Sequence, residues 1–282
     1  MTSPTVKRRR LGLLLQRFRG GTGMTTRDAG SAAERSEAWI SRVEQGKTGV
    51  DIANLRVLLD LYGIADAAVR AEMEDLARGG RQRGWWSRYR SALSEDYAAY
   101  IGFEAGATRL LIWQTLVVDG LLQTEDYMRV VLNYGQRLVP DRIDRLVQVR
   151  LERQQRLTAE PPLELCVVLD EAVLHRIIGG DRGVHARQLD RLVAAAEMPN
   201  VRLQVVPFDE GFNPGMLPSF TVMQFGSNAP DIGYIEGPTS DVYEEGEDAD
   251  RLTLMYEDLR AAALSPSRSI SLIKRVHDEV AT

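Results

Sequence analysis

The N-terminal part of the chain shows the hydrophobic spacing of amphipathic helices. Four apolar side chains recur at i, i+3, i+4 and i+7: Leu11, Leu14, Leu15 and Phe18. This spacing predicts a helix over residues 7–19. Similar apolar faces predict helices over residues 52–62 and 67–77, and Gly63 ends the first of these.

Two short helices are predicted between them, over residues 24–47. Thr25 or Thr26 caps the first helix, and Ser36 caps the second. Ile40 and Val43 lie three residues apart and are predicted to point into the bundle. The N-terminal part is therefore predicted to be a compact bundle of five helices with a helix-turn-helix at its centre.

The run of residues 36–47, SEAWISRVEQGK, resembles the Xre-type (Cro/C1-like) helix-turn-helix. That resemblance implies binding to double-stranded DNA through the second helix, and it implies a homodimer. It also implies a structural ion pair between Arg19 and Glu44. The residues predicted to meet DNA are Thr26, Ser36, Glu37, Ala38, Ser41, Arg42 and Lys47.

The sequence departs from this family at two positions. The glutamine that opens the first of the two helices is Thr26 here, and the usual turn glycine is Glu34. A residue with positive φ costs more for Glu than for Gly. The turn is therefore predicted to be rebuilt by an extra hydrogen bond or a shifted boundary.

The remaining two thirds of the chain alternates strand-like and helix-like segments. Four β-rich runs are predicted as strands: residues 163–169, 201–206, 219–225 and 232–236. Helices are predicted after Thr124 and over or near residues 141–157, 171–178, 184–196, 249–263 and 267–280. The long connection between the first two runs indicates that these strands are parallel. The predicted fold is a mainly α helix-turn-helix bundle followed by a mixed α/β domain with a small sheet flanked by helices.

A second resemblance covers most of this region. It rests on short segments in the expected order, among them 84–86 (GWW), 100–104 (YIGFE), 120–124 (GLLQT), 150–154 (RLERQ) and 169–174 (LDEAVL), with 205–208 (VVPF) and 263–266 (ALSP). These resemble the uncharacterised, antitoxin-like domain of actinobacterial Xre-type regulators, including WhiJ-like proteins. Asp119 is a departure, because relatives have proline there. The resemblance implies that a small protein encoded nearby binds this domain.

A Gly-broken basic segment, GGRQRGWWSRYR over residues 79–90, separates the two regions. The predicted domains are residues 1–78 for DNA binding, 79–92 as a linker and 93–282 as an effector or partner-binding domain. Trp85 and Trp86 have two interpretations. Aromatic residues among arginines stack on bases in some proteins, whereas paired tryptophans after a linker more often anchor it in a core.

Charge divides the chain in the same place. Residues 1–90 contain 17 Lys+Arg and 10 Asp+Glu, while the rest contains 18 and 30. A basic N-terminal region followed by an acidic C-terminal region is typical of a nucleic-acid-binding domain joined to a domain with another role.

The single cysteine, Cys166, lies in an apolar run and is expected to be a reduced interior thiol. Without a signal peptide or transmembrane run, a cytoplasmic location away from the membrane is expected.

Catalytic and metal-binding alternatives have weak support. Asp170 and Glu171 follow a predicted strand, His175 lies four residues further on, and residues 179–183 (GGDRG) resemble a phosphate loop. Asp170 is more simply explained as the N-cap of the next helix, and Glu171 as a partner of the helix dipole in its first turn. No Lys-Ser/Thr completes a P-loop, and the histidines lack metal-site spacing. We therefore expect no enzyme activity, no cofactor and no metal.

The connection over residues 209–218 is rich in Gly, Pro and apolar side chains. Phe212 and Met216 within it are predicted to contact a partner, while a rigid loop packed on its own sheet is the alternative. The predicted function is sequence-specific DNA-binding transcription regulation, with a C-terminal domain that binds a partner. A small-molecule-gated repressor of the same architecture is the alternative, and an enzyme with a regulatory head is a third class.

Overall fold

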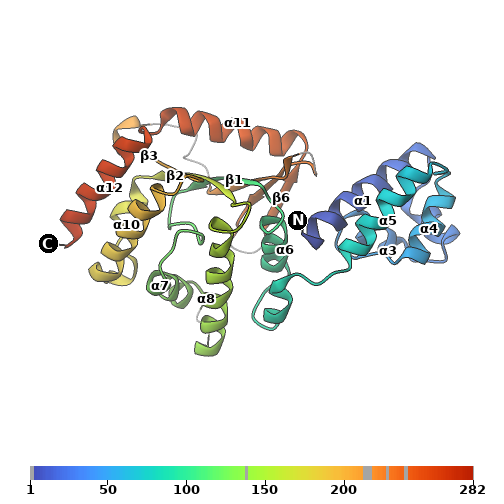
Figure 1. The fold of residues 1–282 in the computed structure, drawn as a ribbon, viewed down its shortest axis with the longest axis horizontal. Coiled ribbons are helices and arrows are strands. Elements are labelled where there is room, and N and C mark those ends of the chain that lie inside the picture. The colour runs from blue at the N-terminus through green and yellow to red at the C-terminus, as the bar shows by residue number, and fades with distance from the viewer. Residues whose placement is uncertain (1–2, 137–138, 212–217, 227–228, 238–240, 282) are drawn as a thin grey trace. The chain divides into compact units, whose positions relative to one another are not determined.

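The computed structural model describes residues 3–136, 139–211, 218–226, 229–237 and 241–281. The chain forms two compact units (Figure 1), which we call the head and the body. The head consists of Met1–Arg88 with Tyr97–Gly106, and the body of Tyr89–Asp96 with Ala107–Thr282. The predicted boundaries at residues 78 and 92 stay a prediction, but residues 97–106 pack with the head rather than with the body.

Among the described residues, the bundle of the head contains the five predicted helices. They are α1 (Pro4–Gly21), α2 (Thr26–Ala32), α3 (Glu37–Glu44), α4 (Ile52–Leu61) and α5 (Ala67–Gly80). Their apolar faces meet in one core, which includes Leu11, Leu15, Ile40, Val43, Leu55, Leu59 and Met73. Burying each of the large side chains contributes about 1.5–3 kcal/mol, so this core fixes how the short helices α2 and α3 are held.

Helix α6 (Glu95–Glu104) packs against the start of α1 within the head. The Ser3 hydroxyl donates a hydrogen bond to the Gly102 carbonyl. A Cβ atom at Gly102 would lie 2.1 Å from Oγ1 of Thr5. Gly102 therefore lets the two helices approach closely, which explains the glycine in the YIGFE segment.

The described part of the body contains six strands in one mixed sheet. They are β1 (Arg109–Gln114), β2 (Glu164–Asp170), β3 (Val201–Val206), β4 (Phe220–Gln224), β5 (Ile232–Ile235) and β6 (Val242–Glu245). Their order is β3-β2-β1-β4-β5-β6. Strands β1, β2 and β3 are mutually parallel, whereas β4, β5 and β6 each join an antiparallel pair. The predicted parallel relation of the first two strand runs, now β2 and β3, is confirmed.

Two of the strands in the sheet, β1 and β6, were not predicted from the sequence. Strand β1 is central, and its residues Leu110–Trp113 are all buried. Strand β6 is an edge strand whose residues are exposed or half-buried. A strand buried on both faces loses the alternation that identifies a strand in sequence, and a charged edge strand has no apolar run.

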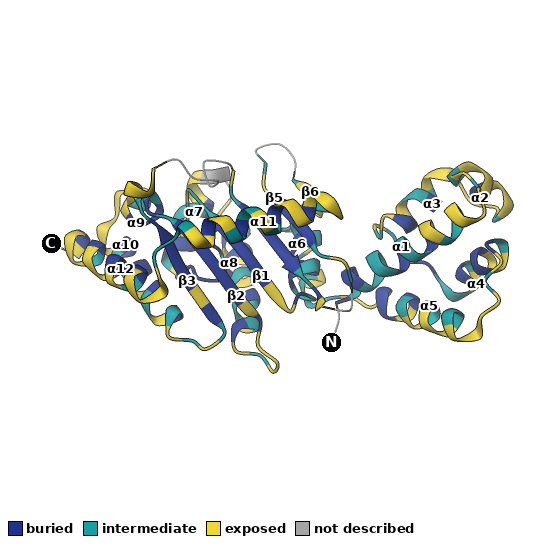
Figure 2. Ribbon diagram, turned by 90° about the horizontal axis from the view of Figure 1, so that it is seen from above, coloured by how far each residue is buried: buried dark blue, intermediate teal, exposed yellow. Residues whose placement is uncertain are grey.

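Helices cover both faces of the sheet. Helix α11 (Glu247–Ala262) lies over one face, and α7 (Glu125–Gln136), α8 (Pro140–Gln154) and α10 (Arg182–Ala196) lie on the other (Figure 1). On the α11 side, Leu252 and Tyr256 pack with the sheet residues Trp113 and Val168. The strands β1, β2 and β3 are dark blue over most of their length in Figure 2, as expected for a sheet buried on both faces.

Helix α12 (Pro266–Ala281) packs along α10 and touches β3.

The helix predicted near residues 171–178 is shorter than expected: α9 covers only Ala172–His175. The helix ends because Arg176 and Ile177 are extended, with ψ angles of 96° and 100°. Gly179 and Gly180 follow with φ angles of 67° and 74°. Cys166 is buried at 8 % exposure, as predicted, and burial raises the pKa of its thiol.

Two of the sequence segments that carry the second resemblance meet in the body. The Gln154 side-chain amide donates to the carbonyls of Gly120 and Gln123, at 2.9 and 2.8 Å. Arg150 donates to Oε1 of Gln123 at 2.5 Å. A Cβ atom at Gly120 would lie 3.1 Å from Nη1 of Arg153. Hydrogen bonds between the segments GLLQT and RLERQ therefore attach α8 to the loop that follows β1.

The segment between head and body contains a short 3-10 helix, Trp85–Tyr89. Trp85 and Trp86 meet edge to face, with ring centroids 5.9 Å apart. A Cβ atom at Gly84 would lie 2.2 Å from the Trp86 ring, so glycine is required before this pair. Tyr89 continues into the body, where its hydroxyl donates to the carboxylate of Glu152.

Candidate functional site

Both helices of the helix-turn-helix begin with a side-chain cap. Thr25 and Asp28 form a reciprocal capping box, in which the Asp28 amide donates to Oγ1 of Thr25 and the Thr25 amide donates to Oδ2 of Asp28. At the start of α3, the Trp39 amide donates to Oγ of Ser36 at 3.1 Å. Both caps satisfy amides that the helix itself leaves unpaired. The predicted caps of both helices are confirmed.

The turn between α2 and α3 contains Glu34, with φ at 54°. Among the described residues it is the one non-glycine residue with positive φ. The turn keeps its shape through a hydrogen bond from the Arg35 amide to the Gly30 carbonyl, at 2.8 Å. A Cβ atom at Gly30 would lie 2.9 Å from the Arg35 carbonyl oxygen. The hydrogen bond from the Arg35 amide and the one from the Glu34 amide to the Ser31 carbonyl, at 3.3 Å, are the ordinary pair of a Schellman motif. The predicted rebuilding of the turn is therefore not observed, because Glu34 adopts the left-handed conformation of the usual glycine.

Helix α3 ends in a Schellman motif. The Lys47 amide donates to the Arg42 carbonyl at 2.9 Å, and the Gly46 amide donates to the Val43 carbonyl at 3.0 Å. Gly46 has φ at 70°, and a Cβ atom there would lie 2.8 Å from Cα of Arg9. The chain therefore turns sharply, and Lys47 begins an exposed loop directly after α3.

The polar residues predicted for DNA contact lie on the outer side of this motif. Ile40 and Val43 are buried at 1 % and 2 % exposure, which turns the other faces of α3 outward. Five of the predicted residues are exposed: Ser36, Glu37, Ala38, Arg42 and Lys47. Thr26 and Ser41 are half-buried. Whether they touch DNA stays a prediction.

The structure joins two of these residues directly. Oγ1 of Thr26 donates to Oε1 of Glu37 at 3.1 Å, and Nε of Arg27 donates to Oε2 of the same carboxylate at 3.3 Å. Arg27 was not among the predicted site residues, although it is the residue next to Thr26. The two carboxylate oxygens of Glu37 therefore already accept hydrogen bonds from α2. Arg42, in contrast, has no side-chain partner among the described residues.

Behind this surface, the predicted Arg19–Glu44 pair is confirmed. Nε and Nη2 of Arg19 donate to the two carboxylate oxygens of Glu44 at 2.7 and 2.8 Å. Nη1 of Arg19 also donates to the Met24 carbonyl at 2.7 Å. The hydrogen bonds that Arg19 donates to Glu44 raise the pKa of Arg19. The pair holds the end of α3 to the end of α1 and faces inward, away from the exposed residues of α3.

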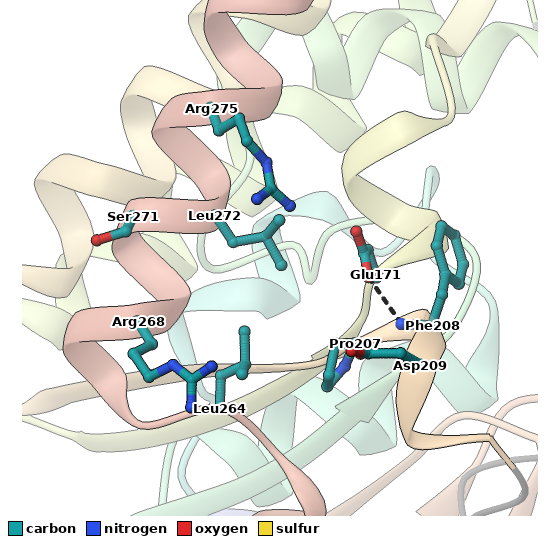
Figure 3. Close-up of a pocket in the computed structure, with 9 residues that line it drawn as sticks. All are labelled: Glu171, Pro207, Phe208, Asp209, Leu264, Arg268, Ser271, Leu272 and Arg275. Atoms are coloured by element: carbon teal, nitrogen blue, oxygen red, sulfur yellow. Dashed lines mark hydrogen bonds between the residues drawn. The ribbon is translucent and has the colours of Figure 1, made fainter.

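The body contains a cavity of about 490 Å³ where β2 and β3 end (Figure 3). Its walls come from the start of α9, the segment after β3 and helix α12. The lining residues are Glu171, Pro207, Phe208, Asp209, Leu264, Arg268, Ser271, Leu272 and Arg275. The carboxyl ends of parallel strands are a common place for ligands in α/β proteins.

The carboxylates proposed for catalysis have structural partners. Oδ1 of Asp170 accepts a hydrogen bond from the Ala172 amide at 2.8 Å. Glu171 is buried, and its Oε2 accepts from the Phe208 amide at 2.7 Å. Nε2 of His175 lies 3.3 Å from the other oxygen of Glu171. Asp170 therefore holds the first amide of α9, but the N-cap residue is Glu171 and not Asp170 as predicted. Glu171 also anchors the segment after β3.

The glycine-rich segment 179–183 ends in a helix cap. Oδ1 of Asp181 accepts a hydrogen bond from the Val184 amide at the start of α10, at 3.0 Å. Within the described residues, no group of three or more His, Cys, Asp and Glu side chains is placed to hold a metal ion. Phe212 and Met216, predicted to bind a partner, lie outside the described residues.

Comparison with known families accounts for both units. Residues 97–275 match a family described as a domain of unknown function (DUF5753), and residues 10–73 match a helix-turn-helix domain. The chain belongs to the DUF5753 family. No curated protein and no solved structure gave a significant match. The helix-turn-helix match indicates a DNA-binding regulator, with the DUF5753 domain as its C-terminal part.

The match to the DUF5753 domain includes α6 and nearly all of the body, and so contains both the cavity and the segments GLLQT and RLERQ. No helix among the described residues is long and apolar enough to cross a membrane.

Proposed function

We propose that the protein is a sequence-specific, DNA-binding transcription regulator of the Xre type, working in the cytoplasm as a homodimer. The observation that carries this proposal is the outer face of α3. It presents Arg42, which has no side-chain partner in the described part of the chain, while Ile40 and Val43 anchor the opposite face in the core. A free guanidinium on a recognition helix matches the paired acceptors of guanine in the major groove.

Around Arg42, the other predicted residues have supporting roles. The hydroxyl oxygen of Ser36 accepts a hydrogen bond from the Trp39 amide as the helix cap, and this bond fixes the position of the side chain. Glu37 must give up its contacts with Thr26 and Arg27 before it can accept from the amino group of cytosine. Arg42 is therefore expected to contribute more to base discrimination than Glu37 does.

The test starts by selecting a binding site from a pool of random duplexes with the full chain. Affinity for that site and for single-base variants is then measured for the parent, Arg42→Ala and Arg17→Ala. Arg17 is an exposed arginine of α1, so it controls for the loss of one positive charge. Arg42→Ala is expected to lose about 1–3 kcal/mol of discrimination at one base position. Equal behaviour of the two variants, or failure to select any site, would contradict the proposal.

Homodimer formation follows from the Xre resemblance. A symmetric dimer would read two half-sites about 34 Å apart, or a multiple of that distance. Footprinting of the selected site together with sedimentation of the protein would test this. A single protected half-site bound by a monomer would contradict it.

We further propose that the DUF5753 domain binds a partner and does not catalyse a reaction. The roles of Asp170 and Glu171 in holding backbone amides support this. The resemblance to actinobacterial, WhiJ-like and antitoxin-like regulators suggests a small protein encoded nearby as the partner. Measuring operator affinity with and without that neighbour, in the parent and in a double variant with Phe212→Ala and Met216→Ala, would test it. Equal affinity in all four cases would contradict this proposal.

The second candidate is a small-molecule-gated regulator. The specific observation that favours it is the cavity beside Glu171 and α12, because its volume of about 490 Å³ falls within the usual range of ligand pockets. A ligand would change DNA affinity only if it distinguishes two states of the protein, and the coupling would be reciprocal.

A further inference from the structure

Helix α12 presents two arginines to the cavity of the body. Arg268 and Arg275 lie seven residues apart, with Leu272 between them on the same wall. Figure 3 shows the guanidinium of Arg275 directed toward the space beside Leu272 and Glu171, and that of Arg268 beside Leu264. Ser271 points away from this space (Figure 3).

Arg268 and Arg275 are both exposed, and they differ in their partners from three other arginines of the body. Arg129, Arg187 and Arg260 each form an ion pair with a nearby carboxylate. Within the described part of the chain, neither Arg268 nor Arg275 has a side-chain hydrogen bond or an ion pair. Each guanidinium carries five N–H donors suited to a carboxylate or phosphate.

The acidic residues of the cavity do not neutralise these arginines. Glu171 is within the cavity wall, but its carboxylate is held by the Phe208 amide and lies beside His175. Asp209 is exposed. Neither forms an ion pair with Arg268 or Arg275 among the described residues. An added anion would therefore find two positive groups without having to displace an existing pair.

Apolar side chains complete the cavity. Leu264, Leu272 and Pro207 line it beside the arginines, and Phe208 is a large aromatic residue that is 61 % exposed. The Phe208 ring stacks on His175, with centroids 5.6 Å apart. Because the ring of Phe208 stacks on His175, it offers an apolar surface to a ligand with little further loss of side-chain entropy.

Hydrogen bonds hold the walls in fixed positions. The Leu264 amide donates to the Val205 carbonyl at 2.9 Å, and the Val205 amide donates to Oγ of Ser269 at 3.0 Å. The Gln204 side chain donates to the Leu264 carbonyl at 2.8 Å. The start of α12 is therefore tied to β3, which fixes the backbone that carries the arginines and Leu272 beside the cavity.

We propose that this cavity binds a small ligand that has one carboxylate and an apolar part. Arg268 and Arg275 take the carboxylate, and Leu264, Leu272 and Phe208 cover the apolar part. A phosphate head would meet the same two arginines, and the experiment separates the two heads. This proposal goes beyond DNA binding, and ligand binding is measured without DNA, so its failure leaves the proposed role in transcription untouched.

The experiment measures binding of phenylacetate, octanoate and phenyl phosphate to the full chain by calorimetry and ligand-observed NMR. Phenylacetamide is the neutral match of phenylacetate. The variants are Arg268→Gln, Arg275→Gln and the control Lys274→Gln, which removes a charge from an exposed neighbour on the same helix. Circular dichroism verifies that each variant is folded.

At least one carboxylate is expected to bind the parent, and each arginine variant is expected to bind it about tenfold more weakly or worse. Lys274→Gln is expected to bind as the parent does, and phenylacetamide is expected to bind at least about tenfold more weakly than phenylacetate. The proposal is overturned if the parent binds no carboxylate, binds only phenyl phosphate, or binds acid and amide alike. An equal loss of carboxylate binding in Lys274→Gln would also overturn the proposal. An acidic peptide is added as a further probe, and binding of that peptide alone would overturn the proposal as well.

Discussion

Arg19 and Glu44 form a two-point ion pair that joins the last turn of α1 to the last residue of α3. Both side chains are largely withdrawn from water, with exposures of 14 % and 6 %. The planar guanidinium matches both carboxylate oxygens. Because α3 has only eight residues, an anchor at its end sets the orientation of the whole recognition helix.

Removing one partner of this pair is expected to destabilise the head. Glu44→Ala leaves the Arg19 guanidinium without its carboxylate and is expected to cost about 3 kcal/mol or more in the free energy of unfolding. Hydrogen exchange of the α1–α3 region in the full chain measures this locally. The control is Glu72→Ala, which breaks the exposed pair with Arg10 and is expected to cost at most about 1 kcal/mol. Similar protection in the two variants would show that the inner pair is not an anchor.

The turn residue Glu34 is expected to be a site of stabilising substitution. A left-handed conformation costs an L-residue about 1–2 kcal/mol, whereas glycine adopts it freely but loses about 0.5–1 kcal/mol of backbone entropy. Glu34→Gly is therefore expected to stabilise the head by up to about 1 kcal/mol. Urea unfolding should show a higher midpoint at an unchanged slope. Glu34→Ala keeps the strain and should not stabilise; a gain in that variant would mean that the side chain, not φ, is the cause.

Asp51 is expected to make the head sensitive to acid. Its carboxylate caps α4 by accepting from the backbone amide of Asn54 at 2.8 Å and from its side chain at 2.7 Å. These hydrogen bonds lower the pKa of Asp51. A lowered folded-state pKa gives a stabilisation that is complete above the unfolded pKa and is lost as the pH falls through the folded value.

Two variants separate the charge from the cap. Asp51→Asn keeps a capping side chain that does not titrate, so its stability is expected to fall less than that of the parent between about pH 5 and pH 2. Asp51→Ala removes the cap and is expected to cost about 1 kcal/mol at neutral pH. Thermal melts across this pH range provide the measurement. The same acid dependence in parent and Asp51→Asn would exclude Asp51 as its source.

Lys47 is expected to bind phosphate and not a base. It lies in the exposed loop that the Schellman motif places directly after α3. Lys47→Ala is expected to weaken binding to all duplexes alike and to reduce the slope of affinity against salt concentration by about 1 on logarithmic scales. Anisotropy titrations at several salt concentrations measure this, with Lys274→Ala in the body as the charge control. A change in sequence preference would instead assign Lys47 to base readout.

Most of the head followed from local sequence signals. Caps such as Ser36, the stop at Gly63 and the apolar spacing of Ile40 and Val43 act within a few residues, so each can be recognised without knowledge of the tertiary fold. At Glu34 the same kind of local argument identified the position but not the outcome, because the turn is not rebuilt and Glu34 keeps a positive φ. The face of α3 that points outward was therefore predictable, although contact with DNA is not shown by its exposure.

The sheet and the cavity depended on tertiary structure. Strand β1 is four buried residues between polar ends, a pattern shared by short helices and strands, and only its pairing with β2 and β4 makes it the centre of the sheet. Glu171 looked like a catalytic carboxylate or a dipole partner because its true partner, the Phe208 amide, is 37 residues away. The sequence determined local backbone geometry and the inward faces of helices, since those depend on near neighbours. The parallel sheet decided which distant segments share an end, and so brought Glu171, Phe208 and two arginines of α12 around one cavity.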